Sequence, residues 1–122
     1  MRTIKFRAWD NKHNEWFLDF SVWLSGDIVY NGLNLVLNPE IIILEQFTGL
    51  TDKNGKEIYE GDVVKIEASY KGTYKGDWIV SFSECSFKIT SYKGFQYNLK
   101  PHMINGTLCK VIGNIHENPE LL

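Results

Sequence analysis

The apolar residues of this chain recur at every second position in short runs, and this period restricts its fold more than any other feature. Ile4, Phe6 and Ala8 form one such run, and Trp78 and Val80 belong to another. Alternation with a period of two puts the apolar side chains of a strand on one face. Turn-forming residues interrupt the runs about every eight to twelve residues, a spacing typical of sandwiches and barrels. The sequence therefore predicts an all-β fold of short antiparallel strands.

The runs and the turn signals between them locate the expected strands. The polar residues 10–15 separate the first run from Trp16–Leu18, which predicts a hairpin. Further strands are expected at 28–30, 33–37, 42–47, 63–66, 78–82, 87–89 and 110–115. Asn38-Pro39-Glu40 favours a short turn over a helix, because three isoleucines follow and β-branched side chains lose rotamer freedom in a helix. Asn118-Pro119-Glu120 predicts a single helical turn near the end.

The stretch TGLTDKNGKEIYEGDVVKI at 48–66 combines turn-formers, charges and a strand. Asn54-Gly55 predicts a chain reversal, and Gly61 supplies positive φ before the strand. Asp62 is expected to tighten the strand entry by accepting a backbone N–H two residues on. The carboxylates here lie beside lysines in turn-forming sequence, so we interpret them as structural rather than as a catalytic pair.

The step EGDVVKI at 60–66 is common at the first strand of small SH3-like barrels. It predicts an SH3-like, partly open barrel in the C-terminal half, packed with an N-terminal sheet rich in hairpins. We therefore expect one domain over 1–122, with β subdivisions at 1–50 and 51–122. A fold of this kind does not by itself fix a function.

Tyr-Lys-Gly occurs three times within a basic segment. The whole chain has a net charge of −2, but residues 68–111 hold six lysines against two acidic residues, a net charge of +4. Aromatic rings stack on bases and lysines neutralise phosphates, so this pattern is typical of single-strand nucleic-acid binding. Tyrosine is also a good strand residue and Lys-Gly a good hairpin corner, which is a purely structural interpretation. The residues of the predicted contact are Tyr70, Lys71, Tyr74, Lys75, Tyr92 and Lys93.

Catalytic and metal-binding motifs are not found in the sequence. Cys85 and Cys109 fit no metal-ligand spacing and predict free thiols in a reducing cytosol. The three histidines stand at no recognisable spacing from a nucleophile. Residues 1–6 lack the apolar core of a signal peptide, and no apolar run approaches the roughly 20 residues of a membrane helix. We expect no catalytic residue, no metal or cofactor, no membrane association and a cytoplasmic location.

Three blocks of this sequence resemble the YopX family of proteins encoded by phages and prophages, chiefly of Gram-positive bacteria. They are IKFRAWD at 4–10, FTGLTDKNGKEIYEGDVVKI at 47–66 and VIGNIHENPELL at 111–122. Residues 68–110 show no signature of the family, and Phe82 stands where a tryptophan is expected. The resemblance implies a mostly β fold and a phage or prophage origin within a bacterial host cell, but it implies no activity and no catalytic residues.

Three functions are consistent with these observations. The first is a non-enzymatic accessory protein of a phage or prophage that acts through protein contacts or self-association. Three of its four tryptophans lie within residues 9–23, where they form either a core or an exposed interface. The second is a single-stranded nucleic-acid binder that uses residues 70–100. The third is a small hydrolase, which requires a concave site that gathers a histidine with carboxylates from distant parts of the chain.

Overall fold

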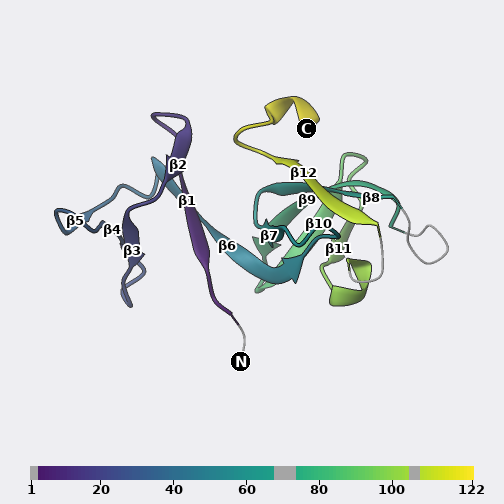
Figure 1. Cartoon of the computed structure of the whole chain (residues 1–122), viewed down its shortest axis with the longest axis horizontal. Coiled ribbons are helices and arrows are strands. Elements are labelled where there is room, and N and C mark those ends of the chain that lie inside the picture. Colours follow the sequence, from purple (N-terminus) through teal and green to yellow (C-terminus); the bar gives the residue numbers. More distant parts are fainter. Residues whose placement is uncertain (1–2, 68–73, 105–107) are drawn as a thin grey trace. The chain divides into compact units, whose positions relative to one another are not determined.

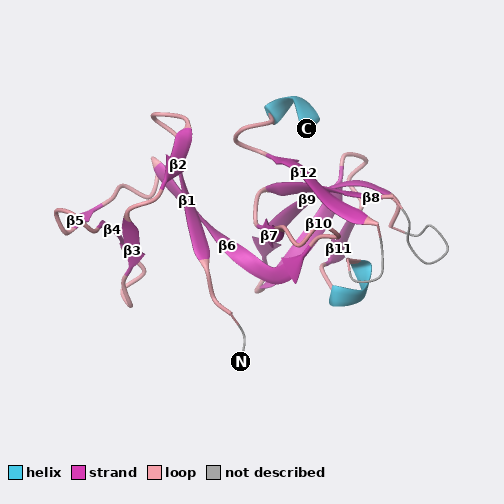
Figure 2. Cartoon of the chain, in the orientation of Figure 1, coloured by secondary structure: helices cyan, strands magenta, loops and turns pink. Residues whose placement is uncertain are grey.

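A computed structural model describes residues 3–67, 74–104 and 108–122, and it confirms the all-β prediction. Strands predominate and pair antiparallel throughout the described chain (Figure 1; Figure 2). The strands are β1 (Phe6–Asp10), β2 (Glu15–Phe17), β3 (Phe20–Val22), β4 (Ile28–Tyr30), β5 (Leu35–Val36), β6 (Ile42–Thr51), β7 (Glu57–Tyr59), β8 (Asp62–Ile66), β9 (Gly76–Ser83), β10 (Ser86–Ser91), β11 (Gln96–Asn98) and β12 (Cys109–Asn114).

Two short 3-10 helices accompany the strands of the described residues. Pro101–Met103 lies between β11 and β12, and Pro119–Leu121 forms the helical turn expected near the end of the chain. Within the described ranges, no helix has the length and apolar character that crossing a membrane requires.

The chain divides into two compact units. Residues 5–46 form the small unit, and residues 47–122 with residues 1–4 form the large unit. The boundary falls inside β6: Ile42 to Gln46 pair with β1, and the rest of the strand pairs with β7. The division predicted after residue 50 falls near the end of the same strand.

The small unit has a modest core. Strands β2, β1 and the first half of β6 are neighbours in one sheet, and β3, β4 and β5 form another. Trp9 and Trp16 face each other across β1 and β2, with ring centroids 5.0 Å apart in an edge-to-face arrangement. Its buried cluster consists of Ala8, Ile28 and Ile42. The strand predicted at 33–37 is limited to Leu35–Val36, which are both exposed and pair with Tyr30 and Val29 of β4. The N–H of Leu37 adds a hydrogen bond to the carbonyl of Ile28 over 2.7 Å.

The large unit has a continuous core inside a five-stranded sheet. Its strand order is β11-β10-β9-β8-β12, and the sheet curls into a half-barrel (Figure 1). Val64 and Ile66 of β8, and Trp78 and Val80 of β9, are buried at alternate positions, as the period of two predicts, and Ile89 of β10 joins their cluster. The buried cluster consists of Ile58, Val64, Ile66, Trp78, Val80, Ile89, Met103, Ile104 and Cys109. β3, β7 and β11, each three residues long, were not predicted from the sequence.

The predicted turns of the 48–66 stretch have the following geometry. Gly55 has φ +81° and its N–H donates to the carbonyl of Asp52 over 3.0 Å, which closes a tight turn through Asn54. Gly61 has φ +83°. The carboxylate of Asp62 accepts the N–H of Tyr59 over 2.8 Å, so it bonds a donor three residues before it and fastens the turn that leads into β8.

Asp52, which the sequence did not single out, organises the same stretch. Its carboxylate is buried and accepts three backbone N–H groups, from Asn54, Lys56 and Val111, each over 2.9 Å. We call this arrangement the Asp52 bridge. Burial opposes ionisation, but these hydrogen bonds and the charge of Lys56 outweigh it and hold the pKa of Asp52 below its ordinary value.

The Asp52 bridge covers the outer edge of β12. That strand pairs with β8 on one side. On the other side Val111 donates to Asp52, and the carbonyl of Cys109 accepts the N–H of Lys53 over 2.9 Å. Backbone groups that would otherwise form an open sheet edge therefore have partners.

Candidate functional site

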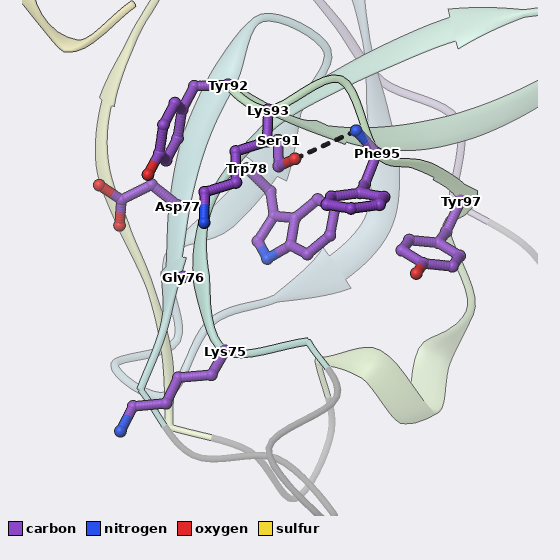
Figure 3. Close-up of a pocket in the computed structure, with 9 residues that line it drawn as sticks. All are labelled: Lys75, Gly76, Asp77, Trp78, Ser91, Tyr92, Lys93, Phe95 and Tyr97. Atoms are coloured by element: carbon purple, nitrogen blue, oxygen red, sulfur yellow. Dashed lines mark hydrogen bonds between the residues drawn. The ribbon is translucent and has the colours of Figure 1, made fainter.

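The large unit carries an open pocket at one end of the β9–β10 hairpin. Its volume is about 440 Å³, within the range of small-molecule sites. Figure 3 shows aromatic rings and charged side chains around it, contributed by β9, by the β10–β11 turn and by β11. The lining residues are Lys75, Gly76, Asp77, Trp78, Ser91, Tyr92, Lys93, Phe95 and Tyr97.

The tight turn between β10 and β11 presents two of these side chains. Gly94 donates its N–H to the carbonyl of Ser91 over 2.9 Å, and Gly94 has φ +89°, which favours glycine. The N–H of Phe95 donates to the Ser91 hydroxyl over 3.2 Å, as the dashed line in Figure 3 marks. Tyr92 and Lys93 occupy the middle of this turn, so both project at the rim of the pocket.

The aromatic lining combines one buried ring with several exposed ones. Trp78 is buried, and its indole N–H donates to the carbonyl of Tyr74 over 2.8 Å. The Trp78 and Tyr97 centroids lie 5.7 Å apart. Tyr92 and Phe95 are 81% and 60% exposed. The pocket therefore offers a fixed indole and accessible ring faces on which a planar ligand can stack.

The charged lining has a positive balance. Lys75 and Lys93 stand against Asp77, the one acidic residue of the lining, for a net charge of +1. The Lys93 ammonium lies 5.8 Å from the centroid of the Tyr92 ring, and Figure 3 shows Lys75 pointing away from the rings. This balance favours an anionic ligand over a cationic one.

A second pocket of about 360 Å³ continues the aromatic surface, because Tyr97 lines both pockets. Tyr74 packs edge-to-face on Tyr97 with centroids 5.4 Å apart, and the His102 ring lies 6.3 Å from that of Tyr74. Lys100 lies on the rim of the second pocket. Rings and lysines thus extend over adjoining hollows.

The structure brings together the predicted contact residues that it describes. Lys75, Tyr92 and Lys93 line the first pocket and Tyr74 lines the second, whereas Tyr70 and Lys71 lie outside the described residues. Trp78 and Asp77 were not predicted as site residues. Trp78 looked like core alone, and the sole signal for both was their position directly after the second Tyr-Lys-Gly triplet.

The remaining described lysines of the basic segment do not line the first pocket. Lys88 is buried, and its ammonium donates to Asn98 Oδ1 over 2.8 Å and to Ser86 Oγ over 3.1 Å. Lys110 lies 3.8 Å from the carboxylate of Glu67. The positive charge of 68–111 is therefore divided between structural and exposed positions.

The paired side chains of Asp10 and His13 have a structural role in a turn. Among the residues that the structure describes, no group of three or more His, Cys, Asp or Glu side chains could hold a metal ion. The carboxylate of Asp10 accepts the N–H groups of Lys12 and His13 and lies 2.7 Å from His13 Nδ1. The hydrogen bond from the His13 side chain lowers the pKa of Asp10, which organises the β1–β2 turn.

A family model and two solved structures show which known proteins this chain is similar to. A family model described as YopX protein matches residues 5–122. A solved structure of protein EF1440 from Enterococcus faecalis is 27% identical, with a TM-score of 0.71 over 100% of this chain and 99% of that one. The structure of protein yopX from Bacillus subtilis is 23% identical, with a TM-score of 0.60 over 100% and 99%. No curated protein matches the chain.

Proposed function

The chain belongs to the YopX family, a kinship that by itself implies no activity. From the pocket of the large unit we propose that it binds single-stranded nucleic acid. The observation that carries the proposal is the gathering of Trp78, Tyr92, Phe95 and Tyr97 with Lys75 and Lys93 around one open pocket.

This set of side chains matches the two components of single-strand binding. Every base has a π-face, and stacking on an aromatic side chain contributes about 1–3 kcal/mol per base. Ammonium groups beside the rings neutralise phosphates, and the release of counterions from the strand drives binding. The accessible faces of Tyr92 and Phe95 supply the stacking surface, and Lys75 and Lys93 supply the charge.

The adjoining pocket gives room for more than one nucleotide. Tyr97 is shared by both pockets, and Lys100 stands on the rim of the second. A strand that stacks one base near Trp78 would place the next along Tyr97 and Tyr74. We therefore expect longer oligonucleotides to bind more tightly than dinucleotides.

Salt dependence of binding to a fluorescein-labelled thymidine dodecamer tests the proposal. Measured by fluorescence anisotropy, the affinity should fall steeply between low and physiological salt. The double variant Lys75→Gln, Lys93→Gln should lower the slope of log affinity against log salt by about 1.4, at roughly 0.7 per phosphate contact. Tyr92→Ala with Phe95→Ala should weaken binding at least tenfold at unchanged slope.

A matched control separates the pocket from general charge. Lys12→Gln with Lys53→Gln removes the same charge from exposed positions outside the pocket and should leave the slope unchanged. Equal effects of the two lysine pairs, or no anisotropy change at low salt with the natural chain, would overturn the proposal.

A second candidate function, self-association as a phage or prophage accessory module, has its own observation. Strand β5 pairs only with β4 in the described structure, and both of its residues are exposed, Leu35 by 56% and Val36 by 59%. Leu33, next to it, is 68% exposed. An unpaired strand edge with apolar side chains is suited to pairing with a second copy of the same edge.

Sedimentation velocity at tens of micromolar tests the second candidate. The natural chain should sediment as a dimer or larger species, and Val36→Lys, which puts a charge on the edge, should sediment as a monomer. A monomer for the natural chain at every concentration would remove this candidate and leave the nucleic-acid proposal untouched.

A further inference from the structure

Resting on the proposed nucleic-acid function, we infer that the pocket prefers guanine and that the carboxylate of Asp77 reads this base. The inference deepens the proposal, because rings and lysines alone would bind any single strand equally well.

Asp77 is the one acidic side chain of the pocket lining, and it stands where a stacked base would present its edge. It is exposed, and it lines both the main pocket and a neighbouring hollow of about 350 Å³. Tyr92 lines the same two hollows, and Figure 3 shows the Asp77 carboxylate on the same flank of the pocket as that ring. A base stacked on Tyr92 therefore comes within reach of the carboxylate.

The carboxylate of Asp77 is also available. Its cross-strand neighbour on β8 is Lys65, but no ion pair joins them, and no other described residue forms a hydrogen bond or ion pair with Asp77. Glu60 and Asp62, which lie at the entry of β8 and at its first position, are outside the pocket lining. A ligand thus meets a charged acceptor whose hydrogen-bonding capacity is unused by the residues that the structure describes.

Among the common bases, guanine alone fits such an acceptor. An ionised carboxylate only accepts hydrogen bonds and can accept two in parallel. Guanine presents N1–H and its 2-amino group side by side on the Watson–Crick edge. Adenine and cytosine place an acceptor beside their amino group, and thymine and uracil place carbonyl oxygens on both sides of their single N–H. Those acceptors would face the carboxylate and repel it.

Lys75 and Lys93 keep the site attractive to phosphate in spite of Asp77, since the lining retains a net charge of +1. The roles are therefore divided: the lysines hold the strand, the rings hold the base plane, and Asp77 selects the base.

Competition among labelled nonamers tests the inference. The probes are a thymidine nonamer and the same nonamer with its central base replaced by guanine, adenine or hypoxanthine, which retains N1–H but lacks the 2-amino group. Guanine should bind about tenfold more tightly than thymine, with hypoxanthine between them, and adenine should show no gain.

Asp77→Asn provides the decisive variant, because it keeps the shape and removes the charge and one acceptor. The guanine preference should fall to near one, while affinity for the thymidine nonamer is kept or raised by the loss of negative charge. Glu84→Gln, at the far turn of the β9–β10 hairpin, makes the same charge change outside the pocket and should keep the preference.

The outcomes distinguish this inference from the proposed function. Equal affinity for all nonamers, or a preference that survives Asp77→Asn, overturns the role of Asp77 while single-strand binding stands. Failure of the natural chain to bind any nonamer at low salt overturns both.

Discussion

The two units of this chain differ in how many hydrophobic residues they bury. The large unit buries nine hydrophobic residues in one cluster, and the Asp52 bridge covers the β12 edge of its half-barrel. The small unit, among its described residues, gathers three in its cluster and buries Trp9 and Val29 outside it. It leaves Leu18 and Leu24 almost fully exposed, at 88% and 109% of their reference areas.

This difference suits the two units to different functions. A unit with a continuous core can hold a preformed site, and the pocket with Trp78 as its buried ring lies there. A unit that leaves large apolar side chains in water gains stability when a partner covers them. Ligand binding is accordingly proposed for the large unit and self-association for the small one.

The largest expected effect tests whether the two cores differ in energy. Ile66→Ala empties a fully buried position of the large unit and should lower the free energy of unfolding by about 3 kcal/mol. Ile28→Ala, in the small unit, should cost less, about 2 kcal/mol, because fewer buried neighbours surround it. Urea unfolding followed by circular dichroism measures both, and equal losses would contradict the comparison.

Thiol labelling measures how closed the large unit is. Burial, together with the nearby charge of Asp52, raises the pKa of Cys109 to about 11 from an ordinary 9.0. Its thiolate is therefore about a hundredfold scarcer near pH 8 than that of an ordinary thiol. The exposed Cys85 should react at once with a disulfide reagent, and Cys109 only when the large unit opens. Rapid labelling of both thiols would show that this core is loosely closed.

Asp52→Asn tests how much the Asp52 bridge stabilises the outer edge of β12. The amide replaces one acceptor with a donor that faces an N–H group, and the variant should lose about 2 kcal/mol at neutral pH. The pKa of Asp52 is lowered in the folded state, so its contribution is present above the ordinary value of 3.8 and is lost as the pH falls through the folded value.

The difference in the free energy of unfolding between the natural chain and Asp52→Asn should therefore become smaller below about pH 4. Urea unfolding at several pH values measures it. Asp27→Asn makes the same chemical change at an exposed loop of the small unit and serves as the control. A difference in unfolding free energy that does not change with pH would contradict the role assigned to the charge of Asp52.

The smallest effect concerns the exposed leucines. Leu18→Gln should change the free energy of unfolding by less than about 0.5 kcal/mol, since the side chain is already in water. Thermal unfolding at low protein concentration measures it. A loss above 1 kcal/mol would show that Leu18 is covered in solution.

The sequence predicts the strands of the fold where the period of two extends over several residues. The runs at 63–66, 78–82 and 87–89 each lie within an observed strand. It fails for β3, β7 and β11, three short strands that are defined by their pairing with neighbouring strands rather than by a local pattern. The role of Asp52 was also out of reach, because Val111, one of its donors, is distant in the chain.

The candidate site could be predicted in part for the same reason. Tyr92 and Lys93 are recognisable as neighbours within one triplet, and composition alone indicates their chemistry. Their meeting with Trp78 depends on the register of β9 and β10, in which Trp78 pairs with Ser91. Register follows from which faces are buried across strands, so no local motif contains it.

The Asp52 bridge has a kinetic consequence. It joins residues 59 positions apart, and such a contact forms only after the intervening strands have been brought together. Interactions absent from the folding transition state control how fast the native state is lost, not how fast it is gained. Asp52 therefore acts on the lifetime of the folded large unit: its replacement should speed unfolding while the refolding rate stays nearly unchanged.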